Sequence, residues 1–271
     1  MNVLISGATG LIGAVLIPEL EAGGHRVTRL TRSPRSAGDI GWDPEDGTIE
    51  GDLNGTVAEI EGSGGSALAL VADVSDASQV REAVERVAGE WGRLDVVFAN
   101  AGVNGVWAPL EELEPEEWSR TLDINLKGTY LTVKYAAPYL KRRGGSVVIT
   151  SSVNGTRMFS NTGATAYACS KAGQVAFARM VALELAEHRV RVNVVCPGAI
   201  ETNIEENTEK RELEEVEAPV EFPEGKVPLT RGRPGSAEQV AQLVLFLASD
   251  ASSHISGTEV FIDGAQSLLQ G

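Results

Sequence analysis

The sequence predicts an α/β fold, in which helices cover both faces of a mostly parallel sheet of seven strands. The first observation behind this prediction is the length of 271 residues, of which 42% are hydrophobic and 23% charged, an ordinary balance for a globular chain with a substantial core. The second is a series of short runs that are apolar at nearly every position, as strands buried on both faces of a parallel sheet are. The third is that helical patterns separate most of these runs.

Each element is placed by its own pattern of apolar residues. The strands are predicted at Val3–Ile5, Arg26–Leu30, Ala67–Val71, Leu94–Phe98, Ser146–Thr150, Val190–Val195 and Glu259–Ile262. The helices are predicted at Leu11–Glu21, Ser78–Trp91, Pro115–Arg142, Ala164–His188 and Ser236–Ser249. Because no repeat or linker divides the chain, this alternation indicates a single doubly wound domain of the Rossmann type over residues 1–271, with its ligand at the carboxyl ends of the strands.

The composition argues against several classes of function. A net charge of −15 without a basic stripe speaks against nucleic acid and anionic lipid as partners. Cys169 and Cys196 make no disulfide framework and no CxxC pair, and His25, His188 and His254 are scattered, so we expect reduced thiols and no metal site. The N-terminal apolar run has no charged leader, and no uncharged stretch approaches the roughly 20 residues of a membrane span, which favours the cytoplasm.

Two stretches break the alternation of strands and helices. Thr31–Gly55 is polar and rich in turn residues, and we expect a functional insertion, a mobile flap or an irregularity of origin there. Residues 201–226 are dense in glutamate and follow a strand end on the ligand side. They fit either a solvated acidic helix and loop or a lid over the substrate.

A glycine-rich turn joins the first predicted strand to the first predicted helix. Glycines let the backbone approach a pyrophosphate closely, and the N–H groups at a helix start attract the anion. The strand before the turn and the helix after it are the context that a dinucleotide site requires. The residues predicted to contact the cofactor here are Gly7, Thr9, Gly10, Leu11, Ile12 and Gly13.

The end of the second strand bears on the choice of cofactor. A site selective for NAD usually places an acid there for the ribose 2′-hydroxyl, whereas a site for NADP places an arginine there for the 2′-phosphate. Here the strand runs into Arg32, and the first acid downstream is Asp39. NADP is therefore favoured, with Arg32 as the phosphate clamp and Ser33 or Arg35 assisting, and NAD is the alternative.

Tyr167 and Lys171 carry the clearest chemical signal. Positions i and i+4 share one face of a helix, so the ammonium would lie beside the phenol. A neighbouring cation favours the phenolate and would lower the pKa of Tyr167 toward the working pH of a general acid/base. Short motifs that contain polar residues also stand at the predicted strand ends and in the long central helix. They are Asp73-Val74, Asn100-Ala101-Gly102, Ser151-Ser152, Asn125 within Asp123–Gly128, Cys196-Pro197-Gly198 and Thr202.

In this order along the chain, these residues resemble the short-chain dehydrogenase/reductase family, and from about Val57 onward they resemble its classical branch. The resemblance implies that Tyr167 exchanges a proton with the substrate oxygen, which Ser152 holds. Lys171 would lower the pKa of the tyrosine and hold the nicotinamide ribose. Asn125 would anchor a water in the proton relay.

The same resemblance implies the other contacts of the cofactor. Asp73 would meet the adenine, Asn100 and Gly102 would line the cofactor path, and Ile200 and Thr202 would hold the nicotinamide amide. The full set implied outside the glycine-rich turn and Arg32 is Asp73, Val74, Asn100, Ala101, Gly102, Tyr167, Lys171, Pro197, Gly198, Ile200 and Thr202.

The N-terminal part departs from the classical branch. Classical members carry TGxxxGxG, whereas this chain has glycines at 7, 10 and 13, as does the extended branch that includes sugar-nucleotide epimerases. Residues 1 to about 50, with Trp42-Asp43-Pro44, resemble an atypical epimerase-like member. The chain therefore reads as a composite with a seam within residues 46–56, from natural recombination or as an engineered chimera. A longer loop than usual between Ser152 and Tyr167 also brings Arg157, Met158 and Phe159 toward the substrate pocket.

The leading interpretation is an oxidoreductase that uses NADP(H) to pass hydride between nicotinamide C4 and a secondary alcohol or ketone. One alternative is a nucleotide-sugar epimerase or dehydratase with tightly bound NAD, which the N-terminal part favours. The other is a non-catalytic NADP-binding module, which need not keep Ser152, Tyr167, Lys171 and Asn125. The resemblance also implies a homotetramer or homodimer packed through the two long central helices, acting on a small carbonyl or alcohol.

Overall fold

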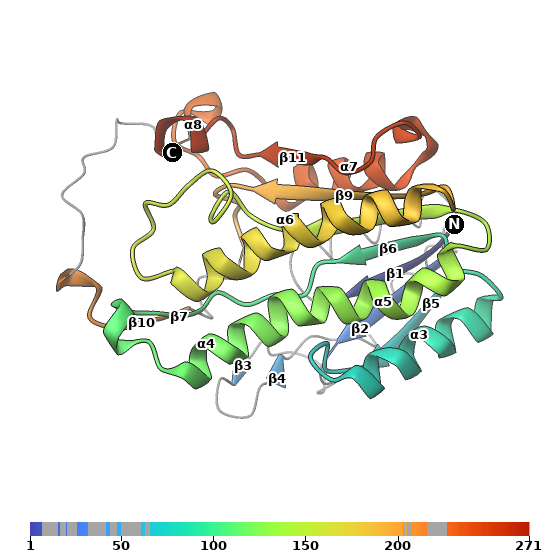
Figure 1. Cartoon of the computed structure of the whole chain (residues 1–271). Coiled ribbons are helices and arrows are strands. Elements are labelled where there is room, and N and C mark those ends of the chain that lie inside the picture. The colour runs from blue at the N-terminus through green and yellow to red at the C-terminus, as the bar shows by residue number, and fades with distance from the viewer. Residues whose placement is uncertain are drawn as a thin grey trace.

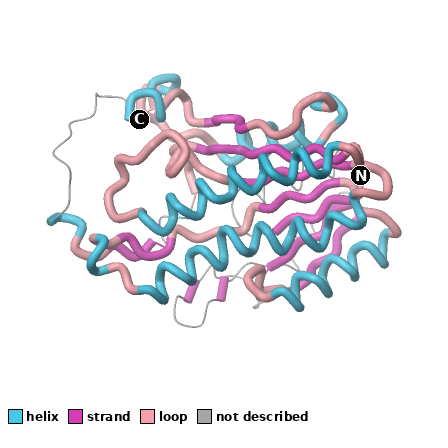
Figure 2. Tube along the Cα trace, in the orientation of Figure 1, coloured by secondary structure: helices cyan, strands magenta, loops and turns pink. Residues whose placement is uncertain are grey.

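The computed structural model describes residues 1–6, 16, 20, 26–31, 42–43, 48–49, 61–62, 66–202, 204, 208–215 and 227–270. Within these residues a twisted sheet of seven strands forms the centre of the molecule, and helices lie against it (Figures 1 and 2). The predicted helix Leu11–Glu21 is described only at Leu16 and Leu20, which are both helical and buried.

Seven parallel strands make up the main sheet. In chain order they are β1 (Asn2–Ser6), β2 (Arg26–Thr31), β5 (Ser66–Val71), β6 (Val96–Ala99), β8 (Gly145–Thr150), β9 (Val190–Pro197) and β11 (Glu259–Ile262). They lie side by side in the order β11-β9-β8-β6-β1-β2-β5, and every neighbouring pair is parallel. All seven predicted strands and the doubly wound fold class are confirmed. The strand order reverses between β1 and β6, which is where such sheets bind their ligands.

Helices cover the sheet on both faces because side chains along each strand alternate between two cores. On β6, Val97 and Ala99 belong to the core shared with α3 (Ala77–Trp91), α5 (Gly128–Leu140) and α6 (Thr165–Ala186). Val96 and Phe98 belong to the other core, with α7 (Ala237–Ala248). A strand that is apolar on both faces reads as a continuous apolar run, which is why the sequence pattern placed these strands correctly.

The predicted helix Pro115–Arg142 has the expected extent but not the expected regularity. It begins as α4 (Pro115–Leu122), passes through a π-helical turn η2 (Asp123–Lys127) and continues as α5. Inside η2 the N–H of Gly128 donates to the carbonyl of Asp123, five residues back. Such a turn holds one extra residue, and it turns Asn125 into the protein, where that side chain is fully buried.

Two short ladders lie outside the main sheet. In the turn-rich stretch Thr31–Gly55, β3 (Trp42–Asp43) pairs antiparallel with β4 (Thr48–Ile49), a short pairing that was not predicted. The seam proposed within residues 46–56 lies outside the described residues except at Thr48–Ile49. The second ladder, in which β7 (Gly105–Trp107) pairs parallel with β10 (Thr208–Lys210), was not predicted. Among the described helices, none combines the length and the apolar character needed to cross a membrane.

Candidate active site

Helix α6 brings Tyr167 and Lys171 together against the sheet. Its buried positions recur every three or four residues, and they include Tyr167, Ser170, Lys171 and Gln174. Tyr167 is 8% exposed and Lys171 is 4% exposed. The Lys171 ammonium lies 5.5 Å from the centroid of the Tyr167 ring, so the spacing of four residues places both groups on one face of the helix, as predicted.

The carboxyl end of β8 holds this helix in place through hydroxyl groups. Ser151 Oγ donates to the main-chain carbonyl of Lys171 at 2.8 Å. Ser152 is 7% exposed, and its Oγ accepts from the N–H of Asn154 at 3.1 Å. The structure places the Ser152 hydroxyl near enough to the phenol to lower the pKa of Tyr167.

Lys171 is a buried cation with a main-chain partner. Its Nζ donates to the carbonyl of Thr150 at 2.9 Å. Burial is the largest influence on this group and lowers the pKa of Lys171 to about 8, while the nearby Cys196 side chain raises it by less. The ammonium is thus poised to lose its proton just above neutral pH.

The pKa of Tyr167 shifts in the opposite direction to the one expected. Burial has the largest effect and raises the pKa of the phenol, because the phenolate loses its hydration. The Ser152 hydroxyl lowers the pKa by less, and the nearby Cys196 side chain raises it further. Tyr167 is therefore held as a neutral, protonated phenol at neutral pH.

Three hydrogen bonds hold the side chain of Asn125. Its Oδ1 accepts from the N–H of Val103 at 2.8 Å, and its Nδ2 donates to the carbonyl of Val103 at 2.9 Å and to Ser170 Oγ at 3.0 Å. Ser170 Oγ in turn donates to the main-chain carbonyl of Tyr167 at 2.7 Å. The π-helical turn is thereby connected to α6 at the level of Tyr167.

Gln174 makes a second connection between the same two helices. Its Nε2 donates to the main-chain carbonyl of Asn125 at 2.9 Å and to Thr129 Oγ1 at 2.8 Å. Sequence reasoning named Ser151 at a strand end without giving it a role, and it missed Thr150, Ser170 and Gln174. The available signal was their spacing, since Ser170 and Gln174 lie on the inward face of α6 and Thr150 lies at a strand end on the ligand side.

Gly102 lies beside two of the predicted catalytic residues, Asn125 and Lys171. A Cβ added there would stand 3.2 Å from Asn125 Oδ1 and 3.4 Å from Lys171 Nζ, so the bare backbone leaves a narrow space. Close by, the N–H groups of Asn100 and Ala101 donate to Ser6 Oγ at 3.1 and 3.3 Å. These bonds tie the ends of β1 and β6 together at the reversal of strand order.

The other predicted contacts of the cofactor lie at neighbouring strand ends. After β5, Asp73 Oδ1 accepts from the N–H and hydroxyl of Ser75, and Val74 packs against Gly128. Pro197 ends β9, and Gly198 passes so close to Asp263 that an added Cβ would stand 2.6 Å from its Cβ. Beyond it, Ile200 bridges to Gly235 and Thr202 is partly exposed.

The cofactor contacts predicted in the glycine-rich turn fall outside the described residues. They are Gly7, Thr9, Gly10, Leu11, Ile12, Gly13 and, beyond β2, Arg32.

The described residues fit a nicotinamide nucleotide. The parallel strands end together, Gly102 leaves backbone accessible beside Lys171, and the strand order reverses there. An ammonium has three N–H donors and the bond to Thr150 uses one of them, so Lys171 suits a ribose hydroxyl as a further partner.

The loop between Ser152 and Tyr167 lines a pocket of about 390 Å³ together with the start of α6. Met158 and Phe159 are among its walls, whereas Arg157 lies over the ring of Phe261, with 3.4 Å between its guanidinium carbon and the ring centroid. Cys169 also lines the pocket, and both cysteines are free thiols as expected.

Comparison with known proteins gives matches over most of the chain. Residues 48–265 match the model of a family described as enoyl-(acyl carrier protein) reductase. The 3-oxoacyl-[acyl-carrier-protein] reductase of Thermotoga maritima is 40% identical over 213 residues, which are 78% of this chain and 82% of the relative. Levodione reductase of Leifsonia aquatica is 37% identical over 202 residues, 74% of each chain.

Solved structures extend the likeness to the whole chain. A 3-ketoacyl-ACP reductase from Sinorhizobium meliloti is 48% identical, with a TM-score of 0.89 over 99% of this chain and 100% of that one. The relatives named here are all reductases, which favours the oxidoreductase interpretation over the nucleotide-sugar epimerase.

Substituting Gly102 by alanine should damage the site without damaging the fold. The added methyl would press on Asn125 and Lys171, and we expect at least a ten-fold loss of turnover or of NADPH affinity, because a misplacement of about 1 Å at a reacting centre can cost 10²-fold. The measurements are NADPH binding by fluorescence, turnover and thermal unfolding.

The matched control is Gly89→Ala on α3, where an added Cβ meets nothing within 4 Å. It should leave turnover unchanged and stabilise the helix by about 0.5–1 kcal/mol. Wild-type turnover and affinity in Gly102→Ala would show that the space beside Gly102 is not used.

Proposed function

Because the chain belongs to the short-chain dehydrogenase/reductase family, we propose that it uses NADP(H) to reduce a ketone, with Tyr167 as the proton donor. The protein is a nicotinamide-dependent oxidoreductase that interconverts an alcohol and a carbonyl group. The observation that carries the proposed direction is the burial of Tyr167 beside Ser152, which leaves a phenol whose pKa is raised. A phenol that keeps its proton at neutral pH is a suitable acid for reduction.

In the proposed mechanism the cofactor supplies the hydride, and this chain supplies orientation and the proton. Ser152 donates a hydrogen bond to the substrate oxygen and keeps it beside the phenol of Tyr167. Tyr167 then gives its proton to that oxygen as negative charge develops there. Lys171 holds a ribose hydroxyl of the cofactor, and Asn125 fixes the backbone of Val103 and the catalytic helix at the correct spacing.

The proposal for NADP rests on the residue that follows β2. Arg32 is the first residue beyond the strand, and an arginine there would pair with the 2′-phosphate, whereas NAD selectivity uses an acid at this point. NAD is the alternative. The contacts proposed for the cofactor are those of the glycine-rich turn, Arg32 and the strand-end residues already described.

Two of the relatives support a proposal about the substrate. Both are named for a 3-oxoacyl or 3-ketoacyl group, so a 3-oxoacyl thioester is the substrate class that we propose first. Levodione reductase supports a free ketone as the alternative. Both substrates offer one carbonyl oxygen to Ser152 and Tyr167.

We further propose a cytoplasmic homotetramer, with a homodimer as the alternative. The outer faces of α5 and α6 expose large apolar side chains, namely Tyr130, Met180 and Leu183, which are 41%, 75% and 83% exposed. A neighbouring copy packed along these two helices would cover them. The segment 201–226 remains a proposed wall or lid of the substrate site within one domain.

Removing the hydroxyl of Tyr167 tests the proposed function. Tyr167→Phe should lower kcat by 10²–10⁴-fold, the usual contribution of a positioned acid, while NADPH affinity stays within about two-fold. The assay follows NADPH consumption with acetoacetyl-CoA and with levodione. Tyr139→Phe, a half-buried tyrosine on α5, is the control and should keep full activity. Undiminished turnover in Tyr167→Phe would rule out this role.

The two directions of the reaction should respond differently to pH. Reduction needs the protonated phenol and the charged ammonium, so its rate should stay level up to about pH 7 and fall as the pH rises through about 8, the pKa of Lys171. Oxidation of the alcohol product needs Tyr167 to accept a proton and uses the same ammonium, so its rate should rise with pH up to about 8. A reduction rate that increases from pH 7 to 9 would contradict the assignment.

Cofactor selectivity should depend on Arg32. Titration of the protein with NADPH and NADH, followed by nicotinamide fluorescence, should give tighter binding of NADPH. Arg32→Ala should weaken NADPH by about ten-fold or more and leave NADH unchanged, because only NADPH has the 2′-phosphate. Arg86→Ala, on an exposed face of α3, should change neither. Equal affinities in the wild type would transfer the proposal to NAD.

A further inference from the structure

Two segments that leave the main sheet at different strand ends run side by side. Residues 104–108 follow β6, and residues 208–213 follow β9, and their strands β7 and β10 pair in parallel away from the main sheet (Figure 1). Asn104 Nδ2 donates to Thr208 Oγ1 at 2.7 Å, and the N–H of Arg211 donates to the carbonyl of Trp107 at 2.9 Å. We call these two segments the outer wall.

The outer wall is continuous with the catalytic groups at both of its ends. At one end, Val103 makes both of its main-chain hydrogen bonds to Asn125. At the other end, the N–H of Ala108 donates to the carbonyl of Gly163 at 3.3 Å. Leu213 lies so close to Gly163 that an added Cβ would stand 2.4 Å from its Cδ2. Since α6 begins two residues after Gly163, the outer wall spans from Asn125 to the start of the catalytic helix.

Acidic side chains gather on both sides of the outer wall. The start of α4 and the turn before it carry Glu111, Glu112, Glu114, Glu116 and Glu117, and the facing segment carries Glu209, Glu212 and Glu214. Like charges at such short range repel each other. The described residues 208–215 contain two cations, Lys210 and Arg211, and the Lys210 ammonium lies over the Trp107 ring at 5.6 Å.

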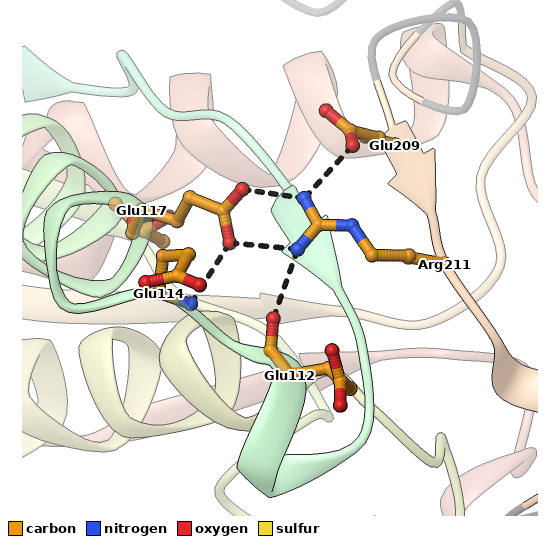
Figure 3. A network of polar contacts seen from close by, with 6 residues as sticks. Glu112, Glu114, Glu117, Glu209 and Arg211 are labelled. Carbon is orange, nitrogen blue, oxygen red and sulfur yellow. Dashed lines mark hydrogen bonds and ion pairs between the residues drawn. The ribbon is translucent and has the colours of Figure 1, made fainter.

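Arg211 joins the two acidic sides (Figure 3). Its Nη2 donates to Glu117 Oε1 at 2.6 Å and to Glu209 Oε1 at 3.0 Å, and its Nη1 donates to the carbonyl of Glu112 at 2.9 Å and to Glu117 Oε2 at 3.5 Å. Glu117 is itself held by the capping box of α4, because its Oε2 also accepts from the N–H of Glu114 at 3.0 Å. A guanidinium that makes a bidentate pair with a fixed carboxylate is held in a defined position, and the pair is also energetically favourable.

We propose that Arg211 is a positioning residue that fixes the outer wall beside Ser152 and Tyr167 and so sets the affinity for the carbonyl substrate. The inference rests on the proposed function, since it concerns the substrate side of the same site. Arg211 acts through Glu117 and the β7–β10 ladder and does not take part in proton or hydride transfer.

The kinetic test uses Arg211→Met, Arg211→Lys and Glu117→Gln with acetoacetyl-CoA and levodione as probes. Arg211→Met should raise KM for the carbonyl by about ten-fold, while kcat and KM for NADPH stay within about two-fold, because only the wall moves. Glu117→Gln keeps a residue that caps α4 and removes the charge, so it should give the same split with a smaller increase. Arg211→Lys keeps the charge without the fork and should fall between wild type and Arg211→Met.

Salt distinguishes this role from a general loss of structure. Without Arg211 the facing glutamates repel each other, so 0.5 M NaCl should recover part of the lost affinity in Arg211→Met and should raise KM in the wild type. Arg81→Met and Glu85→Gln, which break an exposed ion pair on α3, should show neither effect. A wild-type KM in Arg211→Met, or equal losses in kcat and KM, would overturn the inference.

Hydrogen–deuterium exchange tests the same inference without substrate. Amides of residues 105–107 and 208–211 should exchange faster in Arg211→Met than in the wild type, and amides of α3 and β8 should be unchanged. Unchanged exchange in the ladder would overturn the positioning role. A wild-type protein that reduces neither probe would count against the proposed substrates, and the exchange result would still decide whether Arg211 holds the outer wall.

Discussion

The geometry of the site depends on one buried charge, the ammonium of Lys171. Removing such a group from water costs several kcal/mol, and proteins accept that cost only where hydrogen-bond partners are fixed in advance. Here the partner is the main-chain carbonyl of Thr150, at the carboxyl end of a central strand that is buried on both faces. Since a strand between two neighbours cannot shift, the carbonyl is a rigid acceptor. The position of the lysine then sets the position of the tyrosine one helical turn before it.

Hydrogen bonds also hold the surrounding polar side chains, although the Oε1 of Gln174 is buried without a partner among the described residues. Ser151 holds the backbone of Lys171, Ser170 connects Asn125 with the backbone of Tyr167, and Gln174 connects the π-helical turn with the middle of α6. Each of these side chains is buried, so an unpaired partner would be costly. The network therefore restrains the two helices that carry the proposed catalytic groups, and it restrains them at the level of the tyrosine and the lysine.

The raised pKa of Tyr167 follows from this burial and has a functional meaning. A buried phenol keeps its proton, which suits the proposed protonation of a carbonyl oxygen during reduction. The lowered pKa of Lys171 has the same physical origin with the opposite sign, because burial disfavours the charged form of each group. The site thus combines a phenol with a raised pKa and an ammonium with a pKa of about 8. Both properties come from the burial of these groups where α6 packs on the sheet.

The sequence by itself determined the seven strands, the order of elements and the pairing of Tyr167 with Lys171 on one helix face. These features follow from local periodicity, because a strand buried on both faces needs a continuous apolar run and a helix places every fourth residue together. Only the tertiary structure decided the direction of the pKa shift at Tyr167, the π-helical turn at Asn125 and the β7–β10 ladder with Arg211. Each of these depends on groups far apart in the chain, such as Arg211 and Glu117, and on burial. Burial and long-range contacts arise from packing, which the spacing of residues along the sequence does not specify.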